Sequence, residues 1–195
     1  VLMQDYPHIE YIIMDGGSTD GSVEIIKRYG DHLTYWVSEK DGGQSDAINK
    51  GFRHALPIST PNEIMTWLNS DDILLPGALK RVGAIFAQYS QIQWVTGQPA
   101  NLDVDGKHLR LGRMKTGRSR DLIRRGWYHG RGLGFIRQEG TFWRRSLWES
   151  IGGINPNLHY AMDFDLWKRF ASRAPLVTVE QHLAAFRTQP MQKTS

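Results

Sequence analysis

Two adjacent carboxylates, Asp71 and Asp72, are the residues whose types and spacing most clearly suggest chemistry. They follow the apolar run 64–68, which predicts a buried strand, and precede Pro76, which predicts the first residue of a helix. Ligands of open α/β sheets bind beyond the carboxyl ends of the strands. Carboxylate oxygens there suit Mg²⁺ or Mn²⁺, which take further ligands from substrate phosphates. The pattern indicates a metal and diphosphate site, although an acidic turn capping the helix would leave the same sequence.

A glycine-rich turn, residues 15–22 (DGGSTDGS), follows the first predicted strand, 9–14. Adjacent glycines let the backbone approach a ligand closely. Ser18 or Asp20 can cap the helix predicted over 23–29, and a helix N-terminus suits an anion. The turn matches neither the dinucleotide-binding fingerprint nor a Walker A loop. It indicates an anion or nucleotide site, with a plain capped turn as an equal alternative.

Two other predicted helices carry polar side chains that can face a ligand. The helix after residue 43 has Asp46, Asn49 and Lys50 on one side, which faces water or a ligand. A later helix opens near residue 160 with Asp163 and Asp165 in its first turn, where the helix dipole keeps carboxylates ionised. An ionised Asp at a cleft can act as a general base. Capping of the helix is the alternative for both, and it is the preferred interpretation for Asp165.

These residues need a scaffold, and the pattern of predicted elements supplies one. In the first half of the chain, strands at 9–14, 33–37, 64–68 and 93–96 alternate with helices at 23–29, after residue 43 and at 76–89. The second half predicts a hairpin turn at 103–106, an amphipathic helix around 122–127, strands at 138–143, 176–179 and 183–186, and a helix at 144–151. Alternation with short loops favours an α/β fold with a mostly parallel sheet covered by helices.

Composition narrows the class of protein. A chain of 195 residues suits one domain, and the absence of cysteine excludes disulfides and thiolate metal sites. No apolar run is long enough to cross a bilayer, and the first residues lack a signal-peptide pattern. We therefore expect a soluble, cytoplasmic protein. The chain opens on apolar residues that resemble the end of a helix, which predicts a fragment of a longer protein.

The charge is unevenly distributed. The formal net charge is +4, but residues 107–145 hold twelve Lys and Arg against Asp121 and Glu139. This basic segment favours an anionic partner such as a phosphate-bearing substrate or a membrane surface. A solvated face is the alternative. We expect no nucleic-acid partner, because no nucleic-acid-binding motif accompanies the basic and aromatic residues.

Taken together, five ordered motifs resemble the family 2 glycosyltransferases, which are inverting enzymes with the GT-A fold. The motifs lie at residues 4–22 (QDYPHIEYIIMDGGSTDGS), 39–51 (EKDGGQSDAINKG), 67–72 (WLNSDD), 138–145 (QEGTFWRR) and 161–170 (AMDFDLWKRF). The resemblance covers almost the whole chain. It implies one GT-A domain, with a nucleotide-sugar-binding half at 1–97 and an acceptor-binding half at 98–195.

The resemblance also implies roles for individual residues. Asp15 matches the acid that reads the nucleotide base, usually uracil, and Asp41 a second acid near the base. Asp71 is expected to contact the ribose or the sugar, and Asp72 to bind a Mn²⁺ or Mg²⁺ ion. Asp163 is expected to be the catalytic base. Further donor-binding positions are Gly17, Ser18, Asp46, Asn49 and Asn69, and the expected acceptor side comprises Gln138, Glu139, Thr141 and Trp143.

The function implied is transfer of a sugar, with inversion, from a nucleoside-diphosphate donor, expected to be UDP-linked, to a glycan or glycolipid acceptor, as in polysaccharide biosynthesis. Such a hexosyltransferase needs a base to deprotonate the acceptor hydroxyl and a cation to stabilise the leaving diphosphate. Through residues 107–145, the chain can contact a membrane at its inner face. Two alternatives stay open: nucleotidyl transfer, and a non-catalytic relative that binds a nucleotide or an anionic glycan.

The sequence departs from the family pattern at three places, and the first two motivate the non-catalytic alternative. The N-terminal strand of the family, with its nucleotide-contacting segment, has no counterpart, so we expect a truncated donor site. Gln189 stands where the family often has a metal-binding His. Met162 replaces the acid that usually precedes the catalytic Asp.

Overall fold

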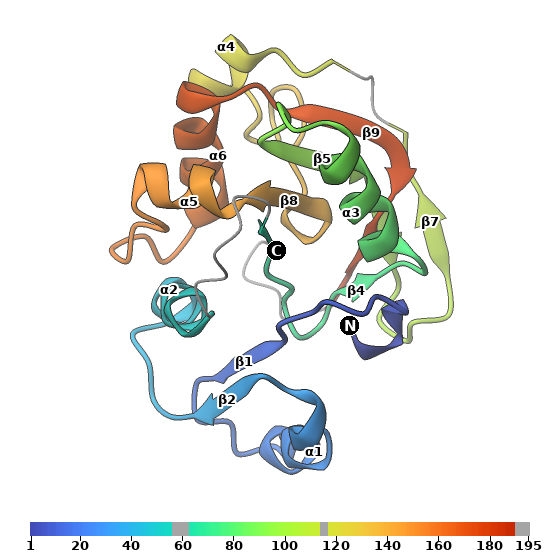
Figure 1. Cartoon of the computed structure of the whole chain (residues 1–195), viewed down its shortest axis with the longest axis vertical. Coiled ribbons are helices and arrows are strands. Elements are labelled where there is room, and N and C mark those ends of the chain that lie inside the picture. The colour runs from blue at the N-terminus through green and yellow to red at the C-terminus, as the bar shows by residue number, and fades with distance from the viewer. Residues whose placement is uncertain (56–62, 114–116, 190–195) are drawn as a thin grey trace.

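The computed structural model describes residues 1–55, 63–113 and 117–189 as a mixed α/β fold (Figure 1). The strands are β1 Ile12–Asp15, β2 Tyr35–Ser38, β3 Ile64–Met65, β4 Ile73–Leu74, β5 Trp94–Gln98, β6 Ala100–Leu102, β7 Leu109–Leu111, β8 Thr141–Arg144, β9 Val177–His182 and β10 Ala184–Arg187. The α-helices are α1 Ser22–Arg28, α2 Gln44–His54, α3 Ala78–Gln88, α4 Arg120–Arg124, α5 Arg145–Ile151 and α6 Met162–Arg173, and short 3-10 turns are η1 Leu2–Gln4, η2 Gly30–His32 and η3 Gln138–Gly140.

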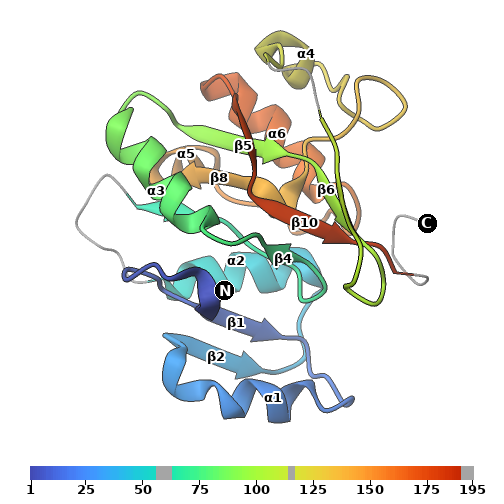
Figure 2. The ribbon, with the colours of Figure 1, turned by 90° about the vertical axis from the view of Figure 1, so that its right-hand side faces the viewer.

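Strands β1 and β2 form a parallel pair at one end of the molecule. Their register aligns Ile12 with Tyr35 and Asp15 with Ser38, so both strands end at the same edge. Helix α1 connects them, and α2 packs against β1 (Figure 2). This unit confirms the strand and helix alternation predicted for the first half of the chain. It places the DGGSTDGS turn beside the loop that follows β2.

The remaining strands form two mixed sheets, in the orders β3-β8-β5-β9 and β4-β10-β6-β7. Strand β8 runs antiparallel to β3 and β5, whereas β9 is parallel to β5. The strand and helix alternation ends at β5, because the chain then enters the β6–β7 hairpin and returns through β8. These two sheets therefore combine parallel and antiparallel pairs, whereas the β1–β2 pair is parallel throughout.

Tryptophan rings fill the main core between α6 and the sheet that contains β8. The ring centroids of Trp143 and Trp67 are 5.3 Å apart, and those of Trp143 and Trp167 are 5.8 Å apart. Trp94 stacks on Trp167 at 5.7 Å, and its indole N–H donates to the carbonyl of Ala174. Burial of such large rings contributes much of the stability of a core. This packing supports two site segments directly, because Trp67 precedes Asn69–Asp72 and Trp167 lies on the helix of Asp163.

Several predicted boundaries differ from the structure. Strand β3 ends at Met65 rather than at residue 68, and α3 begins at Ala78, after a turn in which Ala78 N donates to Leu75 O at 3.0 Å. Residues 138–140 form η3 instead of strand, and the apolar opening of the chain contains the short turn η1. Helix α4 stops at Arg124, because Gly126 adopts a φ of 80° that breaks the helix. None of the described helices is long and apolar enough to cross a membrane.

Candidate active site

Asp15 is held at the end of β1 by the turn that follows it. Its carboxylate accepts hydrogen bonds from the backbone N–H groups of Gly17 and Ser18, at 3.1 and 2.9 Å. The hydroxyls of Ser18 and Ser38 donate to it at 2.5 and 2.6 Å. These bonds, those of the two serine hydroxyls first, lower the pKa of Asp15 to about 2. Asp15 is therefore a permanent anion, suited to accept hydrogen bonds from a ligand.

The loop after β2 brings Asp41 against the DGGSTDGS turn. A Cβ atom at Gly16 would lie 3.1 Å from Oδ2 of Asp41, so glycine permits this close approach. Asp41 also accepts a hydrogen bond from Gly43 N at 2.7 Å. The structure thus brings Asp15, Gly17, Ser18 and Asp41 to one edge. The resemblance assigned the same four residues to the nucleotide.

Asp46 and Asn49 lie on α2, and both are occupied by contacts within the protein. Asp46 accepts from Gly42 N at 3.0 Å and pairs with Lys50 at 3.0 Å, and the Gly42 bond is the main cause of a lowered pKa. The Asn49 amide donates to Ile154 O at 2.8 Å and accepts from Ile154 N at 3.1 Å. These bonds fix α2 to the loop after α5. We therefore assign Asn49 to positioning of α2 and not to direct contact with the donor.

The first turn of α2 joins the two parts of the site. The side chain of Gln44 donates to Oδ1 of Asn69 at 2.7 Å. The hydroxyl of Ser45 donates to the carbonyl of Leu158 at 2.7 Å, in the segment that leads into α6. The N-terminus of α2 thereby lies next to both Asn69 and the approach to Asp163.

Asp72 is buried, 5% exposed, and held from two sides. Arg187 N donates to its Oδ1 at 2.9 Å, and the amide of Asn69 donates to its Oδ2 at 3.3 Å. The guanidinium of Arg187 also donates to the carbonyl of Asp71 at 2.8 Å. Burial raises the pKa of Asp72, and the charge of Asp71 adds to the increase. The end of β10 thus fixes the turn that carries the carboxylate pair.

Gln138 and Glu139 approach this turn from η3. Gln138 donates to the carbonyl of Trp67 at 2.5 Å, and its Oε1 accepts from Asn69 at 3.4 Å. Glu139 is only 4% exposed, and burial raises its pKa to about 7. The negative charges of Asp72 and Asp163 also contribute to the increase.

Asp163 and Asp165 occupy the first turn of α6 but have different environments. One oxygen of Asp163 accepts from Phe164 N at 2.8 Å, and burial raises the pKa of its carboxyl group. Asp165 forms an ion pair with Arg169 at 2.8 Å, one turn later on the helix. The Asp165 carboxylate is therefore paired within α6, whereas the Asp163 carboxylate has no comparable ion pair among the described residues.

Thr141 and Trp143 do not lie where the sequence resemblance suggested. Both are fully buried in β8. The Thr141 hydroxyl bonds to Thr96 and to the carbonyl of Arg137, and the Trp143 ring lies among the rings of Trp67 and Trp167. The alternation of β8 and its flanking strands turns both side chains into the core. We therefore correct their assignment to the acceptor side.

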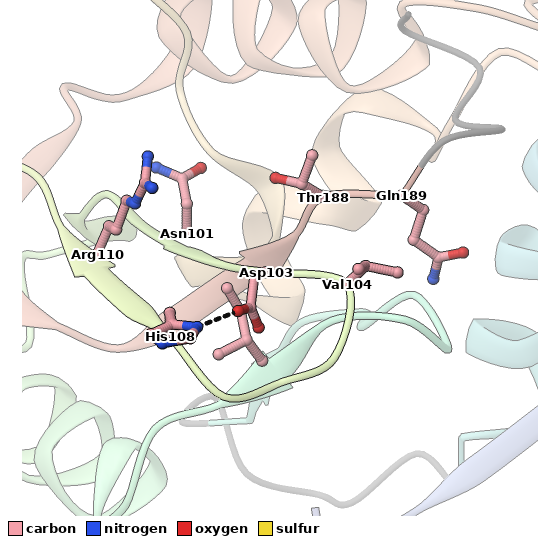
Figure 3. Close-up of a pocket in the computed structure, with 8 residues that line it drawn as sticks. Asn101, Asp103, Val104, His108, Arg110, Thr188 and Gln189 are labelled. Carbon is pink, nitrogen blue, oxygen red and sulfur yellow. Dashed lines mark hydrogen bonds and ion pairs between the residues drawn. The ribbon is translucent and has the colours of Figure 1, made fainter.

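A pocket of about 550 Å³ lies between the β6–β7 hairpin and the residues that follow β10. In Figure 3, Asn101 and Arg110 lie on one side of it, Thr188 and Gln189 on the other, and a dashed line joins His108 to Asp103 at 2.5 Å. Two contacts connect this pocket with Glu139 and Asp72. Arg137, whose charge opposes the increase in the pKa of Glu139, donates to Asn101 at 3.2 Å. Arg187, which holds Asp72, directly precedes Thr188.

Within the ranges that the structure describes, no three His, Asp or Glu side chains converge to hold a metal ion. Asp71 and Asp72 are nevertheless adjacent in the sequence, and Asp72 is buried. Mg²⁺ is commonly bound through one or two protein carboxylates, with water and substrate phosphates as the remaining ligands. This oxygen-donor set suits an ion that binds together with a diphosphate.

Comparison with known proteins decides the family. The sequence model described as glycosyl transferase family 2 matches residues 1–149, about three quarters of the chain. The chain belongs to this family.

Relatives with curated sequences agree with family 2 membership. An uncharacterised glycosyltransferase of Nostoc sp. strain PCC 7120 is 29% identical over 163 residues, which are 80% of this chain and 48% of the relative. A PGL/p-HBAD biosynthesis glycosyltransferase of Mycobacterium bovis is 26% identical over 94% of this chain and 66% of the relative. This family 2 chain thus spans about half the length of the first and two thirds of the second.

Solved structures support the GT-A fold. TarS of S. aureus, residues 1–349 in complex with UDP, superposes with a TM-score of 0.69 at 16% identity, over 96% of this chain and 54% of TarS. The mannosyltransferase PcManGT from Pyrobaculum calidifontis, in complex with GDP-Man and Mn²⁺, superposes with a TM-score of 0.68 at 19% identity, over 97% of this chain and 51% of that protein. The predicted α/β GT-A class is confirmed.

Sequence reasoning missed three residues of this family 2 site: Gln44, Arg137 and Arg187. Each acts through a partner far away in the sequence, as in the bonds Gln44–Asn69, Arg137–Asn101 and Arg187–Asp72. For Arg187, its place beside Gln189 in the segment singled out by the resemblance was a usable signal. No sequence signal pointed to Gln44 or Arg137, because a single polar residue at a helix start or in a basic segment is common.

Proposed function

We propose that this chain transfers a sugar, with inversion, from a UDP-linked donor to a hydroxyl group of a glycan or glycolipid. The observation that carries the proposal is that the N-terminus of α2 bonds both to the Asn69–Asp72 turn, through Gln44 and Asn69, and to the segment leading into the helix of Asp163, through Ser45 and Leu158. A cluster of carboxylates needs a cation, and a helix N-terminus favours an anion. A metal ion with a nucleoside diphosphate satisfies both requirements.

In this proposal, the half formed by residues 1–97 binds the donor. Asp15 and Asp41 accept hydrogen bonds from the base and ribose, and the first turn of α2 faces the diphosphate. Asp72, assisted by Asp71, holds Mn²⁺ or Mg²⁺. When bound, the ion supplies positive charge that stabilises the diphosphate leaving group. The UDP complex of TarS and the GDP-Man and Mn²⁺ complex of PcManGT support a donor of this class.

Asp163 is the proposed base. Burial raises the pKa of its carboxyl group, which makes the carboxylate a stronger proton acceptor than an exposed Asp. The Phe164 N–H holds one of its oxygens, which fixes the orientation of the group. As the acceptor oxygen attacks the anomeric carbon and the bond to the diphosphate breaks, Asp163 takes the hydroxyl proton. No covalent intermediate is needed for inversion.

The half formed by residues 98–195 binds the acceptor in this account. The pocket between the β6–β7 hairpin and the residues after β10 is the proposed acceptor surface, and the buried Gln138 supports the Asn69–Asp72 turn. The amide, hydroxyl and imidazole groups of the pocket match the hydrogen-bonding capacity of sugar hydroxyls.

The test compares Asp163→Asn with Asp165→Asn, a matched control two residues later in the same turn of α6. Both variants are mixed with labelled UDP-, GDP- or TDP-linked sugars and with glycan and glycolipid acceptors. We expect Asp163→Asn to lose transfer by about 10²- to 10⁴-fold and to bind the donor like the wild type. Asp165→Asn should retain transfer, because the Asp165 carboxylate pairs with Arg169 within the same helix. Undiminished transfer by Asp163→Asn would exclude Asp163 as the base.

A further inference from the structure

The loop after α4, residues 125–137, exposes three large apolar side chains. Trp127, Leu133 and Phe135 are 52%, 48% and 56% exposed, and we call them the apolar tip. The loop folds back on itself: Leu133 N donates to Trp127 O at 3.1 Å, and Phe135 pairs with His129 in an isolated β-bridge. The apolar tip is therefore part of an ordered surface.

The same loop is anchored from inside. Tyr128 and Ile136, the sequence neighbours of two tip residues, are buried in the main core. Arg118 donates to the carbonyl of Phe135 at 3.0 Å, and its guanidinium lies 5.2 Å from the centre of the Tyr128 ring. These contacts fix the loop without the tip side chains. The three exposed side chains of the apolar tip are therefore not needed to hold the loop in place. Groups of exposed apolar side chains often mark interaction surfaces.

Arginines surround the apolar tip. Residues 117–137 contain six Arg; Arg118, Arg120 and Arg137 bond to acceptors within the protein, which leaves Arg124, Arg125 and Arg131 on the surface. Arg124 and Arg125 are exposed and share Asp121 at 2.9 and 2.8 Å, and Arg131 is exposed within the loop itself. A partner must therefore offer both negative charge and an apolar layer.

The loop also adjoins the candidate base. A Cβ atom at Gly126 would lie 2.9 Å from the ring of Phe164, so the start of the loop packs directly against the residue after Asp163. Whatever binds the apolar tip is brought close to the Asp163 end of the site.

We propose that the apolar tip and its arginines dock on the surface of an anionic lipid bilayer. Trp favours the interface between headgroups and acyl chains, Leu and Phe enter the upper acyl region, and Arg binds anionic headgroups. Exposed arginines beside exposed apolar side chains match a surface that has anionic headgroups over an apolar layer. Under the proposed function, on which this consequence rests, docking presents a lipid-linked acceptor to Asp163.

Vesicle sedimentation tests the docking. The purified chain is mixed with vesicles of phosphatidylcholine, or of phosphatidylcholine with phosphatidylglycerol, at low and high salt. We expect binding to the anionic vesicles only, weakened by salt. Trp127→Ser/Leu133→Ser/Phe135→Ser and Arg124→Glu/Arg131→Glu should each weaken it by at least about tenfold.

Matched controls lie on α1, at the opposite end of the molecule (Figure 2). Tyr29→Ser removes an aromatic side chain that is 51% exposed, and Lys27→Glu/Arg28→Glu reverses two exposed charges. Both controls should bind vesicles like the wild type. Equal losses in the α1 and loop variants would overturn the proposal, since they would indicate a general charge effect.

Insertion has its own signature. Brominated lipids should quench part of the tryptophan fluorescence of the bound chain, and Trp127→Phe should remove this quenching while leaving binding intact. Quenching that persists in Trp127→Phe would contradict insertion at this loop. Self-association of the wild-type chain that is lost in the triple serine variant would also contradict the proposal, because it would show that the apolar tip binds a second copy of the chain. The Asp163→Asn variant should bind vesicles normally, so this test stands apart from failure of the proposed transfer.

Discussion

At the scale of residues, the site divides its carboxylates into two kinds. Asp15 receives four hydrogen bonds and stays ionised, with a pKa of about 2. Burial raises the pKa values of Asp72, Glu139 and Asp163 instead. The first kind binds a ligand through fixed charge. Carboxyl groups of the second kind can exchange protons near neutral pH, or a bound cation can stabilise their ionised form. Acid and base chemistry requires such a division of roles between carboxyl groups.

Glu139→Gln tests the raised pKa through stability. Between its ordinary value of 4.5 and about 7, the folded chain keeps a proton on Glu139 that the unfolded chain releases. The free energy of unfolding of the wild type therefore falls as pH rises through this window. Gln carries no such proton, so the variant should equal the wild type near pH 4 and exceed it by about 3 kcal/mol near pH 8.

Urea denaturation of both proteins across this pH range measures the difference. The comparison cancels the other titrating groups, which both proteins share. A difference that does not change with pH, or a variant that is less stable near pH 8, would show that Glu139 is ionised and paired in the folded chain.

The sequence indicated most individual site residues, but not their surroundings. Asp71, Asp72 and Asp163 were predicted because carboxylates after a strand or at a helix start are visible in local patterns. The burial of Asp72 by Arg187, and the core positions of Thr141 and Trp143, depend on contacts across the β8 and β10 pairings. Such pairings join residues far apart in the chain, so no local pattern reveals them.

At the scale of elements, α2 organises the site. Its first turn bonds to Asn69 through Gln44 and to the Leu158 carbonyl through Ser45, and its middle bonds to Ile154 through Asn49. The helix therefore connects the β1–β2 unit with the segments that carry Asp72 and Asp163. Its polar face was predicted from sequence to meet water or a ligand, and part of that face instead meets the protein.

Asn49→Ala separates these interpretations. It removes two hydrogen bonds to the Ile154 backbone, so we expect a loss of about 2 kcal/mol in the free energy of unfolding. Affinity of the folded variant for the nucleotide should stay within about twofold of the wild type, a change of about 0.4 kcal/mol.

Arg53→Ala is the matched control, because Arg53 is exposed on the same helix. It should leave stability unchanged. Thermal denaturation gives the stabilities, and calorimetry gives the affinities. A large loss of affinity in Asn49→Ala without a loss of stability would return Asn49 to direct contact with the donor.

The predicted succession of elements was largely correct, because hydrophobic periodicity and turn residues are local signals. The sheet topology was only partly predicted. Strand β8 follows η3 and runs antiparallel to both neighbours, and nothing in residues 138–145 encodes that direction. The end of α4 was missed because the positive φ of Gly126 is visible only in the folded loop.

At the scale of the whole molecule, the site lies where separate units meet. Within the described residues, the β1–β2 pair is not hydrogen-bonded to the other two sheets. Side-chain bonds from α2 make the connection. A donor that spans from Asp15 and Asp41 to Asp72 would bridge these units, so binding should stabilise the whole chain.

The most direct test of this account is a calorimetric titration with UDP, with GDP and TDP as comparisons, each with and without Mn²⁺. Asp72→Asn is the matched variant, because it removes one charge and keeps the shape of the side chain. We predict that UDP binds more tightly than GDP or TDP, that Mn²⁺ is required, and that Asp72→Asn loses the effect of the ion. Binding of none of the three nucleotides, or UDP binding that neither Mn²⁺ nor Asp72→Asn alters, would contradict the proposed donor site.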